Sequence, residues 1–137
     1  MRLAHEARRI ATQHDYLDAL ESTTRLALER GDPREMGEAL RGFDGALDAH
    51  FSLEEQVHFP ALHGLDGSLG AEIETLVREH GSFRQAMAGL RARIPGVAGT
   101  GLDPGILAEF ERLAAVLRSH EQREEALLRR PGDRARK

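Results

Sequence analysis

Apolar residues recur along the chain at the three- and four-residue spacing of an α-helix, in four segments that are separated by clusters of glycine and proline. These breaks fall at residues 31–33, 63–70, 95–104 and 131–132. Asp32-Pro33 and Asp103-Pro104 each fit an N-cap residue followed by proline in the first helical turn. Four long amphipathic helices with short connections predict an all-α fold, an antiparallel up-down four-helix bundle.

The length of 137 residues suits one domain. We expect the bundle to span residues 1–130 and the basic residues 131–137 to form a disordered, solvated tail. The net charge of −4 argues against a nucleic-acid partner, and no apolar run approaches the roughly 18–20 residues of a membrane span. The first residues also lack the apolar core of a signal peptide, so we expect a cytoplasmic protein without membrane contact.

Histidine and glutamate interrupt the apolar face of all four segments. In an antiparallel bundle, residues at equal distances from a turn lie at equal heights. His14 and His50 lie about 18 residues on either side of the first turn, and His80 and His120 lie about 20 residues on either side of the third. The four histidines are therefore expected in one layer. The interrupting residues are His14, His50, Glu54, His80, His120 and Glu124.

Two of the helices repeat the same polar pair. His50 and Glu54, like His120 and Glu124, are four residues apart and so lie one turn apart on one helix face. The second and fourth helices are diagonal in such a bundle, so these pairs would face each other across the core. A buried carboxylate without a partner costs several kcal/mol, and a multivalent cation would remove that cost. Histidines satisfied individually in the core and a metal-free layer of hydrogen bonds are the alternatives.

The chain has seven histidines and no cysteine, so any metal ligands must be nitrogen and carboxylate oxygen. Four nitrogens and two carboxylates exceed the tetrahedral shell of zinc. Two carboxylates can bridge two ions that are each bound by two histidines, which favours a dinuclear centre of iron over manganese.

These segments resemble a known family. The stretch His50-Phe51-Ser52-Leu53-Glu54-Glu55-Gln56-Val57-His58-Phe59-Pro60-Ala61-Leu62 is similar to the second-helix motif of hemerythrin-like, or His-His-Glu cation-binding, domains. The segment Ser119-His120-Glu121-Gln122-Arg123-Glu124-Glu125 is similar to their fourth-helix motif. His14-Asp15 and Glu79-His80 fit the first and third helices, so the resemblance covers about residues 5–130.

The resemblance implies a four-helix bundle around two iron ions, bridged by an oxo or hydroxo group and two carboxylates. The terminal ligands would be His14, His50, His80 and His120, and the bridges would be Glu54 and Glu124. Oxygen-carrying members have a second histidine on the third helix, four residues from the first, and an aspartate on the fourth. Leu76 and Arg84 stand four residues on either side of His80 here. The site therefore looks like the variants in iron-sensing, nitric-oxide-handling and iron–sulfur repair proteins, which disfavours simple oxygen carriage.

Other polar residues are expected outside the ligand set. His58 is two turns beyond His50 and rotated off the apolar face, so we expect it to be partly exposed or to lie behind the ligands. His5, His63 and Tyr16 are expected at the surface. Glu21 is expected at the core boundary, with proton relay or an access path as the alternative. We expect an aromatic and aliphatic wall around the site, made by Phe51, Phe59, Phe83 and Leu117.

The sequence thus predicts a non-haem di-iron protein that binds or reacts with oxygen, nitric oxide or peroxide. No nucleotide-binding glycine motif accompanies the bundle, so electrons for turnover would come from a redox partner protein. The alternative is an iron, oxygen or redox sensor, or an iron-binding module without turnover, that acts through a partner protein. A metal-free structural bundle is the third interpretation.

Overall fold

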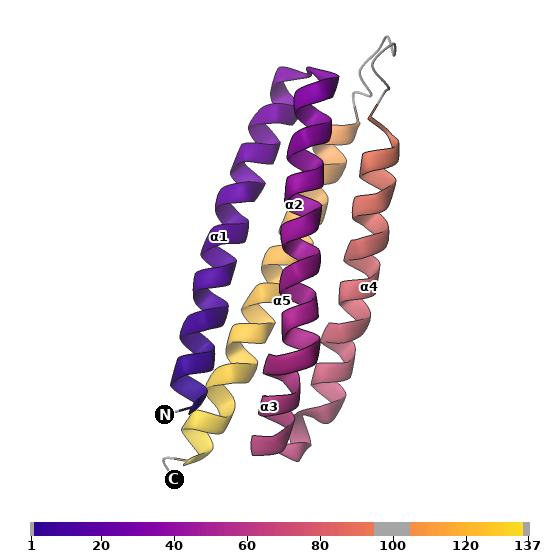
Figure 1. Cartoon of the computed structure of the whole chain (residues 1–137). Helices are drawn as coiled ribbons and strands as arrows, with labels where there is room; N and C mark the ends of the chain where they lie inside the picture. Colours follow the sequence, from indigo (N-terminus) through magenta and orange to yellow (C-terminus); the bar gives the residue numbers. More distant parts are fainter. Residues whose placement is uncertain (1, 95–104, 136–137) are drawn as a thin grey trace.

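The computed structural model describes the backbone of residues 2–94 and 105–135 and the side chains of residues 8–94 and 105–128. Four long helical segments stand side by side, and successive segments run in opposite directions (Figure 1). The described residues contain no strand, and the predicted up-down four-helix bundle is confirmed. The elements are α1 (Arg2–Arg30), α2 (Pro33–Leu53), η1 (Glu54–His58), α3 (Phe59–Leu65), η2 (Gly67–Leu69), α4 (Gly70–Ala92) and α5 (Ile106–Ala135).

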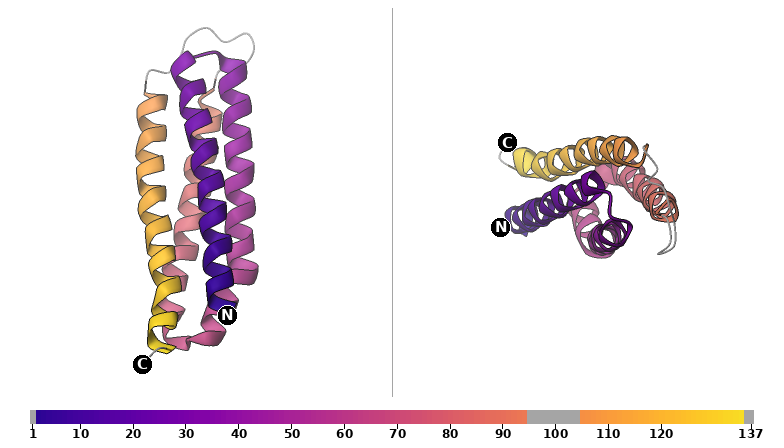
Figure 2. Two further views of the ribbon diagram at one scale, coloured as in Figure 1. Left: turned by 90° about the vertical axis from the view of Figure 1, so that its left-hand side faces the viewer. Right: turned by 90° about the horizontal axis from the view of Figure 1, so that it is seen from above.

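Helix α1 packs against α2 and α5, and α4 also packs against α2 and α5. The diagonal pairs are therefore α1 with α4 and α2 with α5, as the view along the bundle shows (Figure 2). This arrangement confirms that the two helices with His-x-x-x-Glu pairs face each other across the core. No helix in the described parts of the chain has both the length and the apolar character needed to span a bilayer.

The turn between α1 and α2 forms as the sequence predicts. Gly31 has a φ of 78°, a left-handed conformation that ends a helix and is inexpensive for glycine. The Asp32 side chain then caps α2 by accepting a hydrogen bond from the backbone N–H of Arg34 at 3.4 Å, and Pro33 occupies the first turn. The third break, with the cap expected at Asp103-Pro104, lies outside the described residues.

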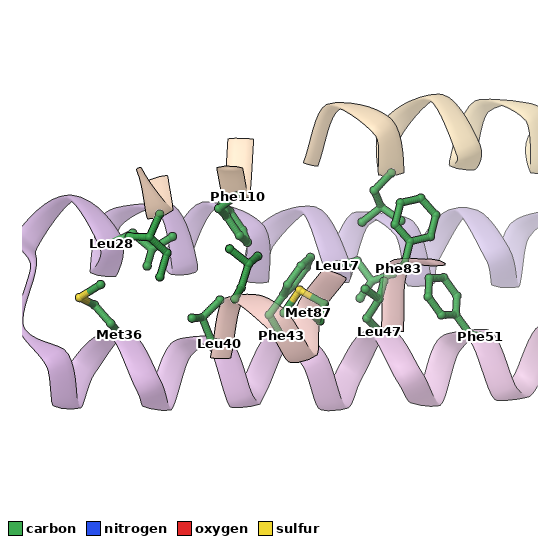
Figure 3. Packing of buried hydrophobic residues seen from close by; sticks show 13 residues of the cluster. Leu17, Leu28, Met36, Leu40, Phe43, Leu47, Phe51, Phe83, Met87 and Phe110 are labelled. Atoms are coloured by element: carbon green, nitrogen blue, oxygen red, sulfur yellow. The ribbon is translucent and has the colours of Figure 1, made fainter. Parts of the chain in front are cut away.

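The apolar interior forms two clusters along the bundle. The larger one extends from the α1–α2 turn to Phe51 and Phe83 (Figure 3). The smaller one, near the α3–α4 turn, contains Ile10, Phe59, Leu62, Leu69, Leu76, Leu127 and Leu128. The layer of histidines and glutamates lies between them, so apolar side chains separate it from both ends of the bundle.

Helix α2 does not continue with regular α-helical geometry. At η1 the backbone N–H of Phe59 donates to the carbonyl of Glu54, five residues earlier, which widens the helix by one residue. Pro60 supplies the physical reason, because it has no N–H and its ring would collide with the carbonyl four residues before it. A π turn at this position relieves that conflict.

The π turn rotates the residues after it by one position. In a regular α-helix, the three- and four-residue spacing that contains Glu54 would continue through Val57 and Ala61, but Val57 is 44% exposed and Ala61 is only half-buried. His58, at 0% exposure, and Leu62 take their places in the core. Of the two positions expected for His58, partial exposure is therefore wrong.

Helix α5 extends beyond the break expected at residues 131–132 and ends at Ala135. The expected solvation of residues 131–137 stays a prediction, since their side chains lie outside the described ones.

We expect Leu40→Ala to lower the free energy of unfolding by about 2–5 kcal/mol, because the side chain is fully buried and its loss leaves a cavity. Leu26→Ala is the matched control on an outward face of α1, where Leu26 is 51% exposed, and it should change stability by less than about 0.5 kcal/mol. Urea unfolding followed by circular dichroism measures both. Equal effects of the two substitutions would contradict this packing of the core.

Candidate metal centre

The structure gathers all six polar residues that the sequence predicts for the metal site into one buried layer. The ring centroids of His14 and His50 lie 5.1 Å apart, and those of His80 and His120 lie 5.0 Å apart. Each helical segment of the bundle contributes at least one of these side chains. The buried members of the layer are His14, His50, Glu54, His80, His120 and Glu124.

The layer divides into two groups that share both carboxylates. The His14/His50 sub-site consists of these two histidines with Glu54 and Glu124, and the His80/His120 sub-site consists of the other two with the same glutamates. Within each sub-site, ligand atoms of the four residues lie within 4.8 Å of one another. Each sub-site therefore offers two nitrogens and two carboxylates to one ion.

The carboxylates are oriented so that they face both sub-sites. Glu124 Oε1 lies 3.2 Å from Nε2 of His14, and Glu124 Oε2 lies 3.5 Å from Nε2 of His120. Glu54 Oε1 lies 3.4 Å from Nε2 of His50 and 3.2 Å from Nε2 of His80. Each carboxylate thus approaches one histidine of each pair.

A second set of side chains orients the imidazoles. Each ring directs Nε2 inward and uses Nδ1 for an outer hydrogen bond, so Nδ1 carries the proton and Nε2 is left as the ligand atom. The acceptors are Glu125 Oε1 for His14 at 3.1 Å, Gln13 Oε1 for His50 at 2.6 Å, Glu55 Oε2 for His80 at 2.7 Å and Glu79 Oε1 for His120 at 2.7 Å.

Arginines hold two of these outer acceptors in place. Arg84 donates to Glu55 at 3.2 Å, and Arg123 donates to Glu79 at 2.8 Å. Partial burial would raise the pKa of Glu79, but Arg123 and His120 outweigh it and lower that pKa. The carboxylate behind His120 is therefore an ionised acceptor, which makes that imidazole a stronger base toward a metal.

Aromatic rings of the larger apolar cluster lie directly against the layer. Phe51 stacks on His80 with centroids 3.9 Å apart and planes 11° apart, and Phe83 meets His120 edge-on at 5.2 Å. Phe59 lies 5.8 Å from His80 on the side of the smaller cluster. Leu117 is buried in the larger cluster, so the expected apolar wall is present.

Burial produces opposing electrostatic effects in the layer. It raises the pKa of Glu54, and the neighbouring Glu124 carboxylate raises it further. Burial alone would also raise the pKa of Glu124, but the protonated Glu54 and the nearby imidazoles hold it well below its usual range. Two adjacent carboxylates in a low-dielectric interior do not both ionise unless a cation balances them.

The imidazoles of one sub-site also differ from each other. Burial lowers the pKa of His50 to about 3, so this ring is neutral at pH 7. Burial alone would lower the pKa of His14, but Glu124, Glu121 and Glu125 outweigh it and raise the pKa to about 9.

The donor set fits metal ions. Among the described residues, Nε2 of His50, His80 and His120, both oxygens of Glu54 and Glu124 Oε2 are buried without a hydrogen-bond partner. Such atoms are rare in native interiors because each costs free energy. First-row ions such as zinc bind these atoms at about 2.0–2.2 Å, so donors on one ion lie between about 3.0 Å and 4.2 Å apart. The 3.2–3.5 Å separations between the carboxylate oxygens and the imidazole nitrogens lie in this range.

The other polar residues singled out in the sequence lie outside this group. His63 and Tyr16 are exposed as expected, whereas the side chain of His5 is not among the described ones. Glu21 is buried rather than at the core boundary, and its Oε2 accepts hydrogen bonds from Arg25 at 3.2 Å and Arg118 at 2.8 Å. These arginines neutralise Glu21 away from the six-residue layer.

The outer acceptors were missed by the sequence reasoning, as was Glu121, a buried carboxylate beside His14. The signal available for Glu55, Glu79, Glu121 and Glu125 was their position next to a predicted ligand. The packing of neighbouring helices decides which of these glutamates contacts a histidine. The helical period of the sequence does not predict such contacts.

The hemerythrin family model, described as the hemerythrin HHE cation-binding domain, matches residues 5–130. No curated protein and no solved structure matches the chain. The match covers all four helical segments and every residue of the layer.

We expect metal binding to release protons and to strengthen as the pH rises from 7 to about 9. His14, with a pKa near 9, holds a proton in metal-free protein and must lose it to bind an ion, whereas His50, with a pKa near 3, is already neutral. Each displaced proton raises the affinity about tenfold per pH unit below that pKa.

Titration with zinc, which has no redox chemistry, in two buffers of different ionisation enthalpy counts these protons by calorimetry. The exposed His63→Gln variant should match the wild type. An affinity that is constant between pH 7 and 9 would contradict the charge state assigned to His14.

Proposed function

The chain belongs to the hemerythrin HHE cation-binding family, and we propose that it is a non-haem di-iron protein that binds or reacts with oxygen, nitric oxide or peroxide. The family supports a cation-binding function, typically with iron. The proposal concerns the number of ions, their identity and the small ligand. The geometry of the six-residue layer supports it.

The observation that carries the proposal is the sharing of Glu54 and Glu124 by two histidine pairs. A site for one ion would need a single group of donors, whereas this layer forms two groups with common carboxylates. Two multivalent cations would also balance the carboxylates in a place where no solvent reaches them. We therefore assign His14 and His50 to one ion, His80 and His120 to the other, and Glu54 and Glu124 to both.

The choice of iron rests on the donor set and on the family. Imidazole and carboxylate together suit iron and manganese, and the absence of cysteine in the sequence excludes thiolate ligands. Two histidines and two shared carboxylates give each ion four protein residues, fewer than an octahedral shell holds. Positions for a small ligand therefore remain, which favours a reactive or sensing centre over a saturated structural one.

The surrounding residues restrict what reaches the ions. Bound iron supplies redox and Lewis-acid chemistry. Phe51, Phe59 and Phe83 close the layer with apolar surface, so water and large polar molecules are disfavoured while small diatomic molecules fit better. The outer acceptors, three carboxylates and the Gln13 amide, keep each Nε2 directed inward during ligand exchange.

We expect protein produced with iron to contain two iron ions per chain and to show near-ultraviolet absorption of an oxo-bridged centre. Glu54→Ala should lose iron from both sub-sites, because both share this carboxylate, and His50→Ala should lose mainly the ion of its own sub-site. His63→Ala, at an exposed position, is the control and should keep both ions. Metal analysis measures the iron content, and absorption spectra report the oxo-bridged centre. Circular dichroism checks that each variant is folded.

Full iron content in both Glu54→Ala and His50→Ala would refute the ligand assignment, and an iron-free wild type would leave a structural bundle. Stopped-flow addition of peroxide or nitric oxide with a reductant then distinguishes function. Catalytic consumption indicates an enzyme, and a spectral change without turnover indicates a sensor or binding module.

A further inference from the structure

One buried carboxylate at the layer has no role in the proposed set of six ligands. Glu121 is 6% exposed, and its Oε2 has no hydrogen-bond partner among the described residues. His14 is the basic side chain with which it forms an ion pair there, at 3.9 Å from Oε2 to Nε2. Its free oxygen therefore faces the same nitrogen that the His14/His50 sub-site offers to an ion.

Glu21 is a second buried carboxylate in this protein, and its partners differ from those of Glu121. Glu21 is as deeply buried as Glu121, but Arg25 and Arg118 both bind its Oε2. Within the described part of the chain, no arginine forms an ion pair with Glu121. A charge that is buried without such a partner points to a cation that belongs to the site.

The position of Glu121 has a counterpart on the diagonal helix. Phe51 follows His50 as Glu121 follows His120, and each of these residues crosses to the opposite sub-site. Phe51 stacks on His80, whereas Glu121 approaches His14. The His80/His120 sub-site thus has an apolar ring where the His14/His50 sub-site has a carboxylate.

Building on the proposed di-iron function, we infer that Glu121 is an additional ligand of the ion held by His14 and His50. The 3.9 Å separation from His14 Nε2 lies within the range of about 3.0–4.2 Å expected for two donors on one ion. Glu121 is outside the group of donors that all lie within 4.8 Å of one another, so its carboxylate would move closer to the ion on binding. The two ions then have different protein ligands. One has two histidines and three carboxylates, and the other has two histidines, two carboxylates and a more open shell against Phe51.

This asymmetry assigns different roles to the two ions. The ion at His80 and His120 keeps more exchangeable positions and lies against apolar rings, so it is the one that takes a small apolar ligand. The ion at His14 and His50 is held by more charge and exchanges ligands less readily. The outer acceptor of His50 is the neutral Gln13, so the additional carboxylate supplies charge that this sub-site otherwise lacks.

The test compares the full-length wild type with Glu121→Gln, using iron(II) without oxygen and a competing chelator. Wild-type protein should bind two ions per chain. Glu121→Gln should weaken one of them by about tenfold or more and leave the other unchanged. Glu125→Gln is the matched control on the same helix, because Glu125 binds the outer nitrogen of the same histidine, and it should weaken binding less.

Mössbauer spectra of iron-57 protein give a second readout. Wild type should show two distinct iron environments, and Glu121→Gln should change one of them while the other keeps its parameters. Unchanged affinities and spectra would overturn the inference and leave the proposed function intact. Equal weakening of both ions would also overturn it, since that would indicate a general loss of structure. A wild type with fewer than two ions would instead refute the proposed function.

Thermal unfolding separates a metal ligand from a structural residue. In metal-free protein, Glu121→Gln should change the midpoint little, because the amide keeps the size of the side chain and only one ion pair, to His14 at 3.9 Å, is lost. The same substitution should reduce the increase in midpoint that iron produces. A lower midpoint both with and without iron would assign Glu121 to the fold and contradict its role as a ligand.

Discussion

The structure depends on two carboxylates, Glu54 and Glu124, that lie together in the middle of an apolar bundle. Burial raises the pKa of Glu54 because the charged form loses its solvation, and the adjacent Glu124 carboxylate raises it further. The surrounding helices bring four imidazoles to these oxygens instead of arginines. An interior of this kind is stable when cations complete it, so the same arrangement that would weaken a metal-free bundle makes it a metal protein.

The rest of the bundle holds this layer in position. Apolar clusters on both sides keep water away, and the outer hydrogen bonds set the direction of every imidazole. The π turn after Glu54 contributes as well, since it turns His58 and Leu62 into the core below the layer. An irregular turn next to a functional carboxylate agrees with the frequent occurrence of π turns at such sites.

The layer is symmetric in its ligand pattern and asymmetric in its surroundings. Each diagonal helix contributes one His-x-x-x-Glu pair, but the residue after the histidine is Phe51 on one helix and Glu121 on the other. Outer acceptors differ too, with Gln13 behind His50 and arginine-held carboxylates behind His80 and His120. The two sub-sites therefore differ in charge and in access. In the proposed centre, one sub-site would hold its ion firmly and the other would exchange a ligand.

The sequence alone determined the four-helix bundle, its turn at Gly31 and the common height of the four histidines, because helical period and segment length are local properties. It placed His58 wrongly, since Pro60 changes the helix geometry and the π turn shifts His58 and its successors by one position. It also did not reveal Glu55, Glu79 and Glu121 as neighbours of histidines on other helices. Only the tertiary structure decided those contacts, because they depend on how the helices pack and which side chains cross between them.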